Sequence, residues 1–180
     1  MACLAYTNST AFDDSGIDSP LAKEIFIGTN TLEVIQSTKI PILTVPEKAK
    51  NNKVDKIAMA VDLKKIKDPE QLRPLLEMAK ICRASIEFVH VMHPDDQDST
   101  KDRFNQIMFL EKFASQASSN IHIITDTDII EGLSRYVATE KPDMLAMLSR
   151  KHTLFDRLFS ESLTNKLSFR SEIPLLVMDE

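Results

Sequence analysis

The side chains best suited to chemistry in this sequence stand directly after short apolar runs. Asp62 follows the run 57–61, and the run 144–148 is followed by four polar residues, Ser149, Arg150, Lys151 and His152. A carboxylate accepts hydrogen bonds from hydroxyl or amine groups, and a basic run can bind an anion. These residues are therefore the first candidates for a ligand site.

The other reactive side chains form no recognised catalytic or metal-binding pattern. Gly-x-Ser-x-Gly, His-Glu-x-x-His and Walker loop patterns are all absent. His90 and His93 are three residues apart on or just past a predicted strand, which makes them a poor pair for one metal ion. His122 is predicted to be structural, and Cys3 and Cys82, in apolar surroundings, are predicted to be buried reduced thiols. We expect no enzymatic activity and no bound metal.

The composition is that of an ordinary globular protein. Of 180 residues, 43% are apolar and 27% are charged, which is enough for one complete core and an appendage. The 22 basic and 27 acidic side chains give a net charge of −5, which does not support a nucleic-acid or anionic-membrane partner. The apolar run 2–6 has no basic flank and is too short for a signal peptide or a membrane span. We expect a cytoplasmic protein with no membrane contact.

Five apolar runs predict the strands of a sheet. Each run is continuous rather than alternating, as in strands that are buried on both faces. The runs are 57–61, 86–92, 121–125, 144–148 and 174–178.

Helical patterns separate these runs. The first helix is predicted to begin at Asp68-Pro69, the second to be capped by Asp98 or Ser99, and the third to be capped by Asp128 with Glu131. The apolar stripe of the second helix consists of Phe104, Ile107, Leu110, Ala114 and Ala117. Strands alternating with helices predict an α/β fold with a doubly wound, Rossmann-like, five-stranded parallel sheet and helices on both faces.

The sequence also contains a repeat, because residues 21–45 resemble residues 154–178. A constant offset pairs Phe26 with Phe159, Thr31 with Thr164, and Ile40-Pro41-Ile42-Leu43 with Ile173-Pro174-Leu175-Leu176. A repeat of this length predicts a duplicated domain.

Only the second copy has a complete domain before it. We predict that residues 1–50 are the last strand, helix and strand of a first domain plus a polar linker, and that residues 51–180 are a complete domain. About 45 residues bury too little surface to fold alone, so the N-terminal unit must dock on the complete domain or on a second copy of the chain.

The pattern resembles the universal stress protein family. Residues 57–62 are similar to its opening strand ending in Val-Asp, 158–164 to its penultimate loop and helix start, and 173–177 to its closing strand. Residues 23–31 resemble the same loop in the first half of tandem members. The resemblance covers 21–45 and nearly all of 54–180, and implies a non-enzymatic stress-response protein with a regulatory or interaction role.

Nucleotide-binding members of that family share the pattern Gly-x2-Gly-x9-Gly-[Ser/Thr] after the fourth strand, and here the pattern is degenerate. Its positions fall on Leu148, Lys151, Glu161 and Ser162, so all three glycines are lost and an acid stands where phosphate would lie. In the N-terminal copy only the last two positions survive, as Gly28 and Thr29. We therefore expect no cofactor and disfavour ATP binding at both places.

The family's strand order implies a crevice beyond the carboxyl ends of the first and fourth strands. It would bring together Asp62, Val91 and the run 149–152, with Ser162 nearby. Asp62 would then bind a ribose or an amine, and Arg150, Lys151 or the amides near Ser162 would bind an anion. The alternative is that Asp62 caps the following turn and the basic run is a solvated loop, and both interpretations stay open. A small-ligand or nucleotide-binding regulator is the second functional hypothesis.

A phosphoacceptor receiver domain is a different candidate fold with five parallel strands. Asp62 and Asp126 would end its first and third strands, and Ser149 its fourth. That fold needs a second acid beside Asp62, where Leu63 stands, and a lysine after the fifth strand, which runs into Met178 instead. We regard it as the weaker hypothesis.

The duplicated ending predicts an assembly. Segments 40–45 and 173–178 are both rich in residues that favour strands, and an uncovered apolar edge invites another strand. We predict that they pair antiparallel, within one chain or between two. Apolar surface around Leu4, Phe26 and Ile35 further predicts a homodimer or a larger symmetric assembly.

Overall fold

The computed structural model describes residues 38–46, 49, 53–63, 69–95, 100–113, 115, 117–149 and 173–179. Its strands are β1 (Ile42–Thr44), β2 (Lys56–Ala60), β3 (Ser85–Met92), β4 (Ser119–Thr125), β5 (Met144–Ser149) and β6 (Leu175–Asp179). Its helices are η1 (Pro69–Leu72), α2 (Arg73–Cys82), α3 (Thr100–Phe113) and α4 (Ile129–Glu140). Within these ranges, no helix has both the length and the apolar character needed to cross a bilayer.

The strands form one sheet in the order β1-β6-β5-β2-β3-β4. The five strands β2 to β6 are parallel, as predicted, and β1 adds an antiparallel sixth strand. Numbered along the chain, the parallel strands have the order 3-2-1-4-5. Receiver domains have the order 2-1-3-4-5, in which the first strand lies beside the third. Here the first parallel strand, β2, pairs with β3 and β5, so the receiver hypothesis is wrong.

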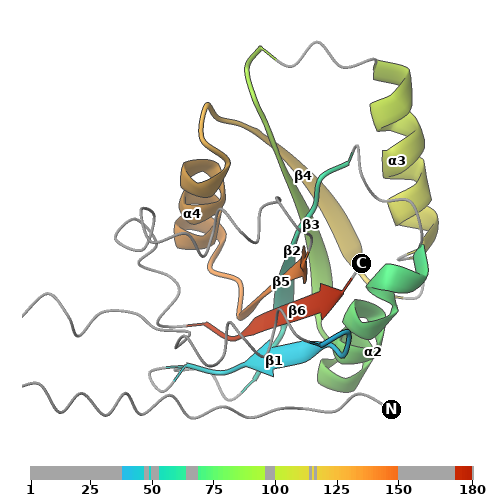
Figure 1. The fold of residues 1–180 in the computed structure, drawn as a ribbon, viewed down its shortest axis with the longest axis vertical. Helices are drawn as coiled ribbons and strands as arrows, with labels where there is room; N and C mark the ends of the chain where they lie inside the picture. The colour runs from blue at the N-terminus through green and yellow to red at the C-terminus, as the bar shows by residue number, and fades with distance from the viewer. Residues whose placement is uncertain are drawn as a thin grey trace, which may run out of the picture.

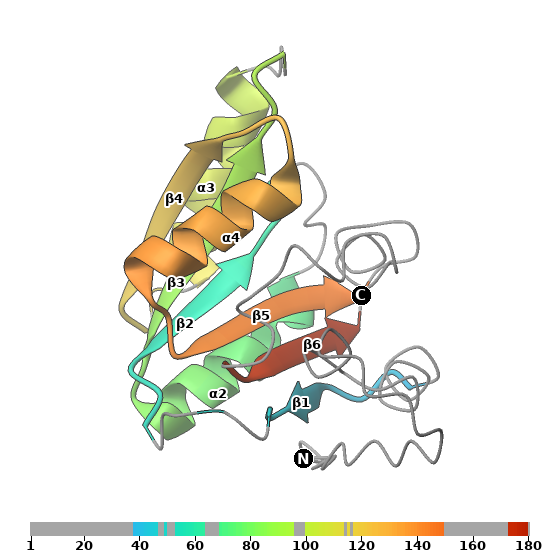
Figure 2. The ribbon, with the colours of Figure 1, turned by 90° about the vertical axis from the view of Figure 1, so that its left-hand side faces the viewer.

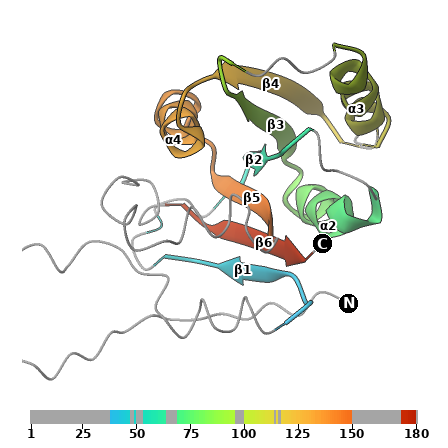
Figure 3. The same ribbon diagram turned by 45° about the horizontal axis from the view of Figure 1, so that its top comes forward.

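The sheet separates two helical layers. Helices α2 and α3 cover one face and α4 covers the other. Figure 3 shows α4 on one side of the strands and α2 and α3 on the other, and Figure 2 shows α4 in front of the sheet. The arrangement follows from right-handed crossovers, because the connections through α2 and α3 lead away from β2 in one direction and α4 returns the chain to β5.

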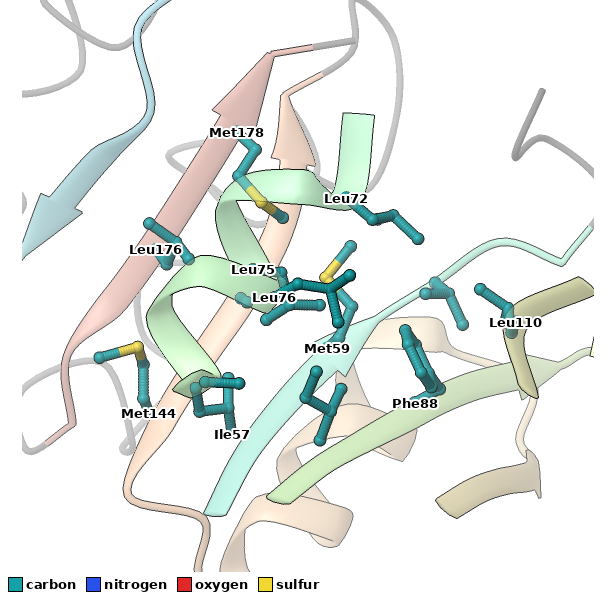
Figure 4. Packing of buried hydrophobic residues seen from close by; sticks show 14 of the residues in the cluster. Ile57, Met59, Leu72, Leu75, Leu76, Phe88, Leu110, Met144, Leu176 and Met178 are labelled. Carbon is teal, nitrogen blue, oxygen red and sulfur yellow. The ribbon is translucent and has the colours of Figure 1, made fainter. Parts of the chain in front are cut away.

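Each face of the sheet has its own core, because alternate side chains of a strand point to opposite faces. The α2/α3-face core contains Ile57 and Met59 of β2 and Phe88 of β3, packed against Leu75 and Leu76 of α2 (Figure 4). The α4-face core contains Ala58 and Ala60 of β2, Val89, Leu133 and Val137 among others. Both cores draw on the same short apolar runs, as expected for strands buried on both faces.

The helix starts agree with the sequence in one case and differ in another. Asp128 caps α4, and its Oδ1 accepts hydrogen bonds from the amides of Ile130 at 2.7 Å and Glu131 at 3.3 Å. The first helix was predicted to start at Pro69, but Pro69–Leu72 is a 3₁₀ turn and the α-helix begins at Arg73. Pro74 explains the difference, since a proline has no amide hydrogen and its ring crowds the carbonyl four residues earlier.

In β4 and α3 the observed burial differs from the prediction. The run 121–125 was predicted to be buried on both faces, but β4 is an edge strand and Ile123 is 41% exposed. Phe104 was predicted to lie on the core stripe of α3, but it is 59% exposed, while Leu110 is fully buried. In a helix of 3.6 residues per turn, two residues that are three apart differ by about 60° around the helix axis. Phe104 and Leu110, which are six residues apart, therefore differ by about 120°.

The short strand β1 pairs antiparallel with β6, joining Ile42 to Val177, Leu43 to Leu176 and Thr44 to Leu175 (Figure 1). The predicted pairing of the two closing segments therefore occurs within one chain, and β6 is not a sheet edge. Residues 1–37, which contain most of the predicted N-terminal unit, lie outside the described residues.

Candidate functional site

The carboxyl ends of β2 and β5 lie side by side where the crossovers change direction. The connection from β2 passes through α2 on one face, and the connection into β5 passes through α4 on the other. Ligands of open α/β sheets bind at such a point, because the chain leaves neighbouring strands in opposite directions. The observed topology therefore places the carboxyl ends of the first and fourth parallel strands side by side, as the family's strand order implied.

Strand register brings three of the predicted residues into one row. Ala60, the last residue of β2, is level with Val89 of β3 and with Met147 of β5, and Asp62, Val91 and Ser149 each follow two residues later along their own segments. Ser149 is in turn paired with Asp179 at the end of β6. We call Val91, Asp62, Ser149 and Asp179 the carboxyl-end row.

The row lies on the side of the sheet that α4 covers. By alternation, Val91, Ser149 and Asp179 share the face of Val89, Met147 and Val177, which belong to the α4-face core. Sequence reasoning missed Asp179. The signal was present, because Asp179 directly follows the closing apolar run as Asp62 follows the opening one.

His90 fixes the backbone next to the carboxyl-end row through a hydrogen bond. The side chain is buried, and its Nδ1 lies 3.1 Å from the carbonyl oxygen of Val61. Since a carbonyl only accepts, Nδ1 is the protonated nitrogen in this contact. The bond holds the chain next to Asp62 against β3. His93 is exposed, and its Nδ1 accepts a hydrogen bond from the amide of Asp95 at 3.2 Å. The two histidines therefore do not act as a pair.

An ion pair lies at the carboxyl end of β4. Asp126 Oδ2 lies 2.7 Å from Arg135 Nη2, and Asp126 Oδ1 accepts the amide of Asp128 at 3.0 Å. The hydrogen bond from the Asp128 amide, and then the charge of Arg135, hold the pKa of the Asp126 carboxyl below its usual range. Arg135 is a cation near this edge that sequence reasoning missed, because it stands nine residues along the chain from its partner.

Among the described residues, the charges at this edge do not favour a phosphate. The first amides of α4, which could bind an anion, already donate to the carboxylate of Asp128. Within the described residues, the carboxyl end of the sheet also carries the acids Asp62, Asp126 and Asp179, and its cation Arg135 is paired with Asp126. A hydroxyl or an amine suits these acceptors better than a second anion does.

Leu148 stands where the nucleotide pattern has its first glycine. It is a strand residue of β5, paired with Met178 of β6, and its side chain packs against the α2/α3-face core. A glycine at this point would let the backbone approach a ligand, whereas a packed leucine continues the strand. The other predicted positions, Arg150, Lys151, His152, Glu161, Ser162, Gly28 and Thr29, lie outside the described residues.

A second polar cluster lies further down the sheet, between β3, β4 and α4. Glu87 is 6% exposed, and its carboxylate contacts His122 Nε2 at 2.7 Å and accepts from Asn120 Nδ2 at 3.1 Å. The ring of His122 packs against Tyr136, with centroids 5.2 Å apart. His122 thus has the structural role that was predicted for it.

The hydroxyl of Tyr136 is buried and has no hydrogen-bond partner among the described residues. Burial, and then the charges of Glu87 and Glu140, raise the pKa of this phenol. Elsewhere, Cys82 is half-buried rather than buried, with its Sγ 3.8 Å from Met78 Sδ, and this burial raises its pKa. Among the described residues, no three His, Cys, Asp or Glu side chains are grouped as a metal site would require.

A sequence profile of the universal stress protein family matches residues 53–179. The chain belongs to the universal stress protein family. The match begins before β2 and ends with β6, so it contains the five parallel strands and leaves β1 outside. No curated protein matches the chain by sequence.

Solved structures of universal stress proteins share the fold. A putative member from Pseudomonas aeruginosa UCBPP-PA14 matches with a TM-score of 0.63 and 14% identity, over 98% of this chain and 62% of that one. A member from Archaeoglobus fulgidus DSM 4304 matches with a TM-score of 0.55 and 18% identity, over 82% of this chain and 52% of that one. This chain thus spans 52% to 62% of the length of these longer proteins, which suggests a tandem arrangement.

A third structure, described as a universal stress protein in complex with cAMP, is similar with a TM-score of 0.52 and 10% identity. The match covers 71% of this chain and 98% of that one. At this level of identity the similarity concerns the fold.

Proposed function

We propose that this universal stress protein is a non-enzymatic regulatory or interaction protein whose nucleotide site is degenerate. The observation that carries the proposal is Leu148, a core-packed strand residue at the first glycine position of the nucleotide pattern. A phosphate needs close approach to backbone amides, and a packed leucine does not provide it.

The charges near the site support the same conclusion. Asp62 and Asp179 are both members of the carboxyl-end row, and the first amides of α4 already donate to the carboxylate of Asp128. Glu161, at the third glycine position of the pattern, would add another negative charge. ATP with magnesium should therefore bind weakly or not at all.

The second candidate function is a small-ligand or nucleotide-binding regulator. It is favoured by the register that aligns Asp62, Val91 and Ser149 at the topological switch point. Asp62 could accept a ribose hydroxyl, and Arg150 and Lys151 could bind a phosphate. A structural neighbour is described as a complex with cAMP, which makes cyclic nucleotides the first ligands to test.

A thermal-shift screen with ATP and magnesium, AMP, cAMP and inorganic phosphate separates the two functions. A ligand that binds only the folded state raises the melting temperature, and calorimetry then measures its affinity. We expect no shift for ATP, and micromolar ATP binding would overturn the degenerate site. For any ligand that binds, Asp62→Asn should weaken it, while Asp55→Asn, at the opposite end of the same strand, should not.

The absence of enzymatic activity belongs to the same proposal. An ATP hydrolysis assay should give the same rate for the wild type and for Asp62→Asn. A rate of ATP hydrolysis that is above the uncatalysed background in the wild type and is lost in Asp62→Asn would contradict the proposal.

We also propose that the chain forms a homodimer or a larger symmetric assembly in the cytoplasm. Since β1 and β6 already pair within one chain, these strands can join two copies only if β1 is exchanged between them. Light scattering at micromolar concentration tests self-association, and a strictly monomeric mass would refute it.

A further inference from the structure

The sheet has a second edge, formed by β4, which lies on the far side from β1 (Figure 3). Among the described residues β4 pairs only with β3. The outward edge of β4 faces away from β3, which carries Val91, the nearest member of the carboxyl-end row.

The hydrogen-bond pattern shows which backbone groups of β4 point outward. The amide of Ile86 donates to the carbonyl of Ser118, and the amide of Asp126 donates to the carbonyl of Met92. In a parallel ladder the residues that bond to one neighbour alternate with residues that face away. The even-numbered residues 118–126 therefore bond to β3, and Ser119, Ile121, Ile123 and Thr125 turn their amides and carbonyls outward. At the end of the strand, the Thr125 carbonyl accepts from Arg135 Nη2 at 3.4 Å.

The two edges of the sheet are protected differently. At one edge, β1 has only three residues and lies between Pro41 and Pro46, which have no amide hydrogen to offer. At the other, β4 has seven residues without proline, glycine, lysine or an acid, and His122 is its one titratable side chain. Long edges without charges or prolines are the ones that pair with a further strand.

The outward-facing residues of β4 read almost the same in both directions. They are a hydroxyl, two isoleucines and a hydroxyl: Ser119, Ile121, Ile123 and Thr125. An antiparallel pair centred on His122 would place Ile121 of each copy beside Ile123 of the other, and Ser119 beside Thr125. Cross-strand pairs of matched side chains stabilise antiparallel strands, and this match identifies a second copy of the chain as the fitting partner.

Helix α3 adds apolar surface along the same edge. Ile107 and Leu110 face the sheet, Phe109 packs toward the core, and Phe104 and Met108 lie on the other flank, 59% and 49% exposed. Helix α3 runs antiparallel to the strands it covers. Because the helix is right-handed, the flank that carries Phe104 and Met108 then lies on the β4 side of α3. Because stable interfaces bury about 1,200 Å² or more in total, this flank must contribute beside the strand.

We propose that β4 is a self-association edge, at which two copies of this chain pair antiparallel about a two-fold axis through His122. The pairing satisfies the outward amides and carbonyls of both strands and covers Ile123, Phe104 and Met108 of both copies. It would extend the sheet across two chains and leave β1, β6 and the carboxyl-end row outside the interface.

Sedimentation of the full chain over the micromolar range tests the proposal with a matched pair of variants. Ile123→Lys places a charge at the centre of the edge and should raise the dimer dissociation constant about tenfold or more. Ile81→Lys makes the same change at another exposed isoleucine, on α2, and should leave the dimer intact. A chain that is monomeric throughout, a dimer that survives Ile123→Lys, or a dimer that Ile81→Lys also dissociates would overturn the proposal.

Disulfide trapping tests the register in a background of Cys3→Ser and Cys82→Ser. Ser119→Cys and Thr125→Cys, on different copies, would have Cα atoms about 5.5 Å apart, within disulfide range. Under oxidation, the mixture of the two variants should give a covalent dimer that neither variant gives alone. A covalent dimer from either variant alone, or none from the mixture, would contradict the antiparallel register.

Discussion

At the residue scale, Gly132 determines how closely α4 approaches the sheet. A Cβ atom at this position would lie 2.7 Å from Val91 Cγ1 and 3.1 Å from the Cβ of Asp126. Val91 is buried and Asp126 is fixed by Arg135, so neither neighbour can move away freely. The same contact joins a helix to the carboxyl-end row, which makes the position of α4 part of the site's geometry.

We expect Gly132→Ala to destabilise the protein, although alanine favours a helix by about 1 kcal/mol over glycine. Overpacking of a fixed core contact costs about 1–3 kcal/mol and should outweigh that gain. Urea unfolding would measure the difference, with Thr139→Ala, at an exposed position of the same helix, as the control. A Gly132→Ala variant that is as stable as the wild type would show that the backbone of α4 shifts easily.

A second residue-scale prediction concerns the pH dependence contributed by Asp126. Its folded-state pKa is lowered by the Asp128 amide and Arg135, so its contribution to stability is complete above the unfolded pKa of about 3.9. The contribution is lost as the pH falls through the lower folded-state value. The difference in unfolding free energy between the wild type and Asp126→Asn should therefore be constant between about pH 5 and 7 and shrink below about pH 4. The exposed Asp95→Asn is the control, and a difference that does not change with pH would contradict the assignment.

At the element scale, β1 is a strand from outside the segment that matches the family, and it pairs with the last strand of the family domain. Ile42 is 3% exposed and belongs to the α4-face core, although it lies outside the segment that matches the family. Two residues earlier, Ile40 is 51% exposed. The start of the strand accounts for the contrast, since proline at position 41 marks the point at which the ladder begins.

We expect Ile42→Ala to lower the unfolding free energy by about 2–5 kcal/mol, as for other buried large-to-small changes. Ile40→Ala should change it by less than about 0.5 kcal/mol, as surface substitutions usually do. Hydrogen exchange should show faster exchange of the β6 amides in Ile42→Ala, because β1 protects that edge. Equal stability of the two variants would mean that β1 is not docked in solution as it is in the structure.

At the scale of the whole molecule, the sheet has one edge closed by β1 and one formed by β4. Removing residues 1–50 would uncover the edge of β6, whose apolar run has no charge before Asp179. We expect the shortened chain to be less stable and to associate more strongly than the full chain. The shortened chain and the full-length chain are compared with Ile123→Lys present in each, so that pairing at β4 does not contribute. Sedimentation that shows only monomers of the shortened Ile123→Lys chain would contradict the role of β1 as a cover.

The sequence by itself determined the local chemistry. The apolar runs predicted the five parallel strands, Asp128 predicted the start of α4, and the repeat of Ile-Pro-x-Leu predicted that the two closing segments would pair. These features depend on neighbouring residues or on a repeated motif, so they can be read along the chain. The sequence also predicted that Asp62, Val91 and Ser149 lie at one edge of the sheet, because parallel strands end at the same edge, and their role in binding a ligand stays a prediction.

Only the tertiary structure decided which strand became an edge and which distant residues met. Nothing in the run 121–125 distinguishes it from the buried runs, yet β4 is half-exposed because its neighbour on one side is β3 and the described residues place none on the other. The pairs Asp126 with Arg135, His90 with the Val61 carbonyl, and Glu87 with His122 depend on strand register and helix placement. Register and helix placement are fixed by packing between different elements, and for that reason the pattern within any one element could not have revealed these contacts.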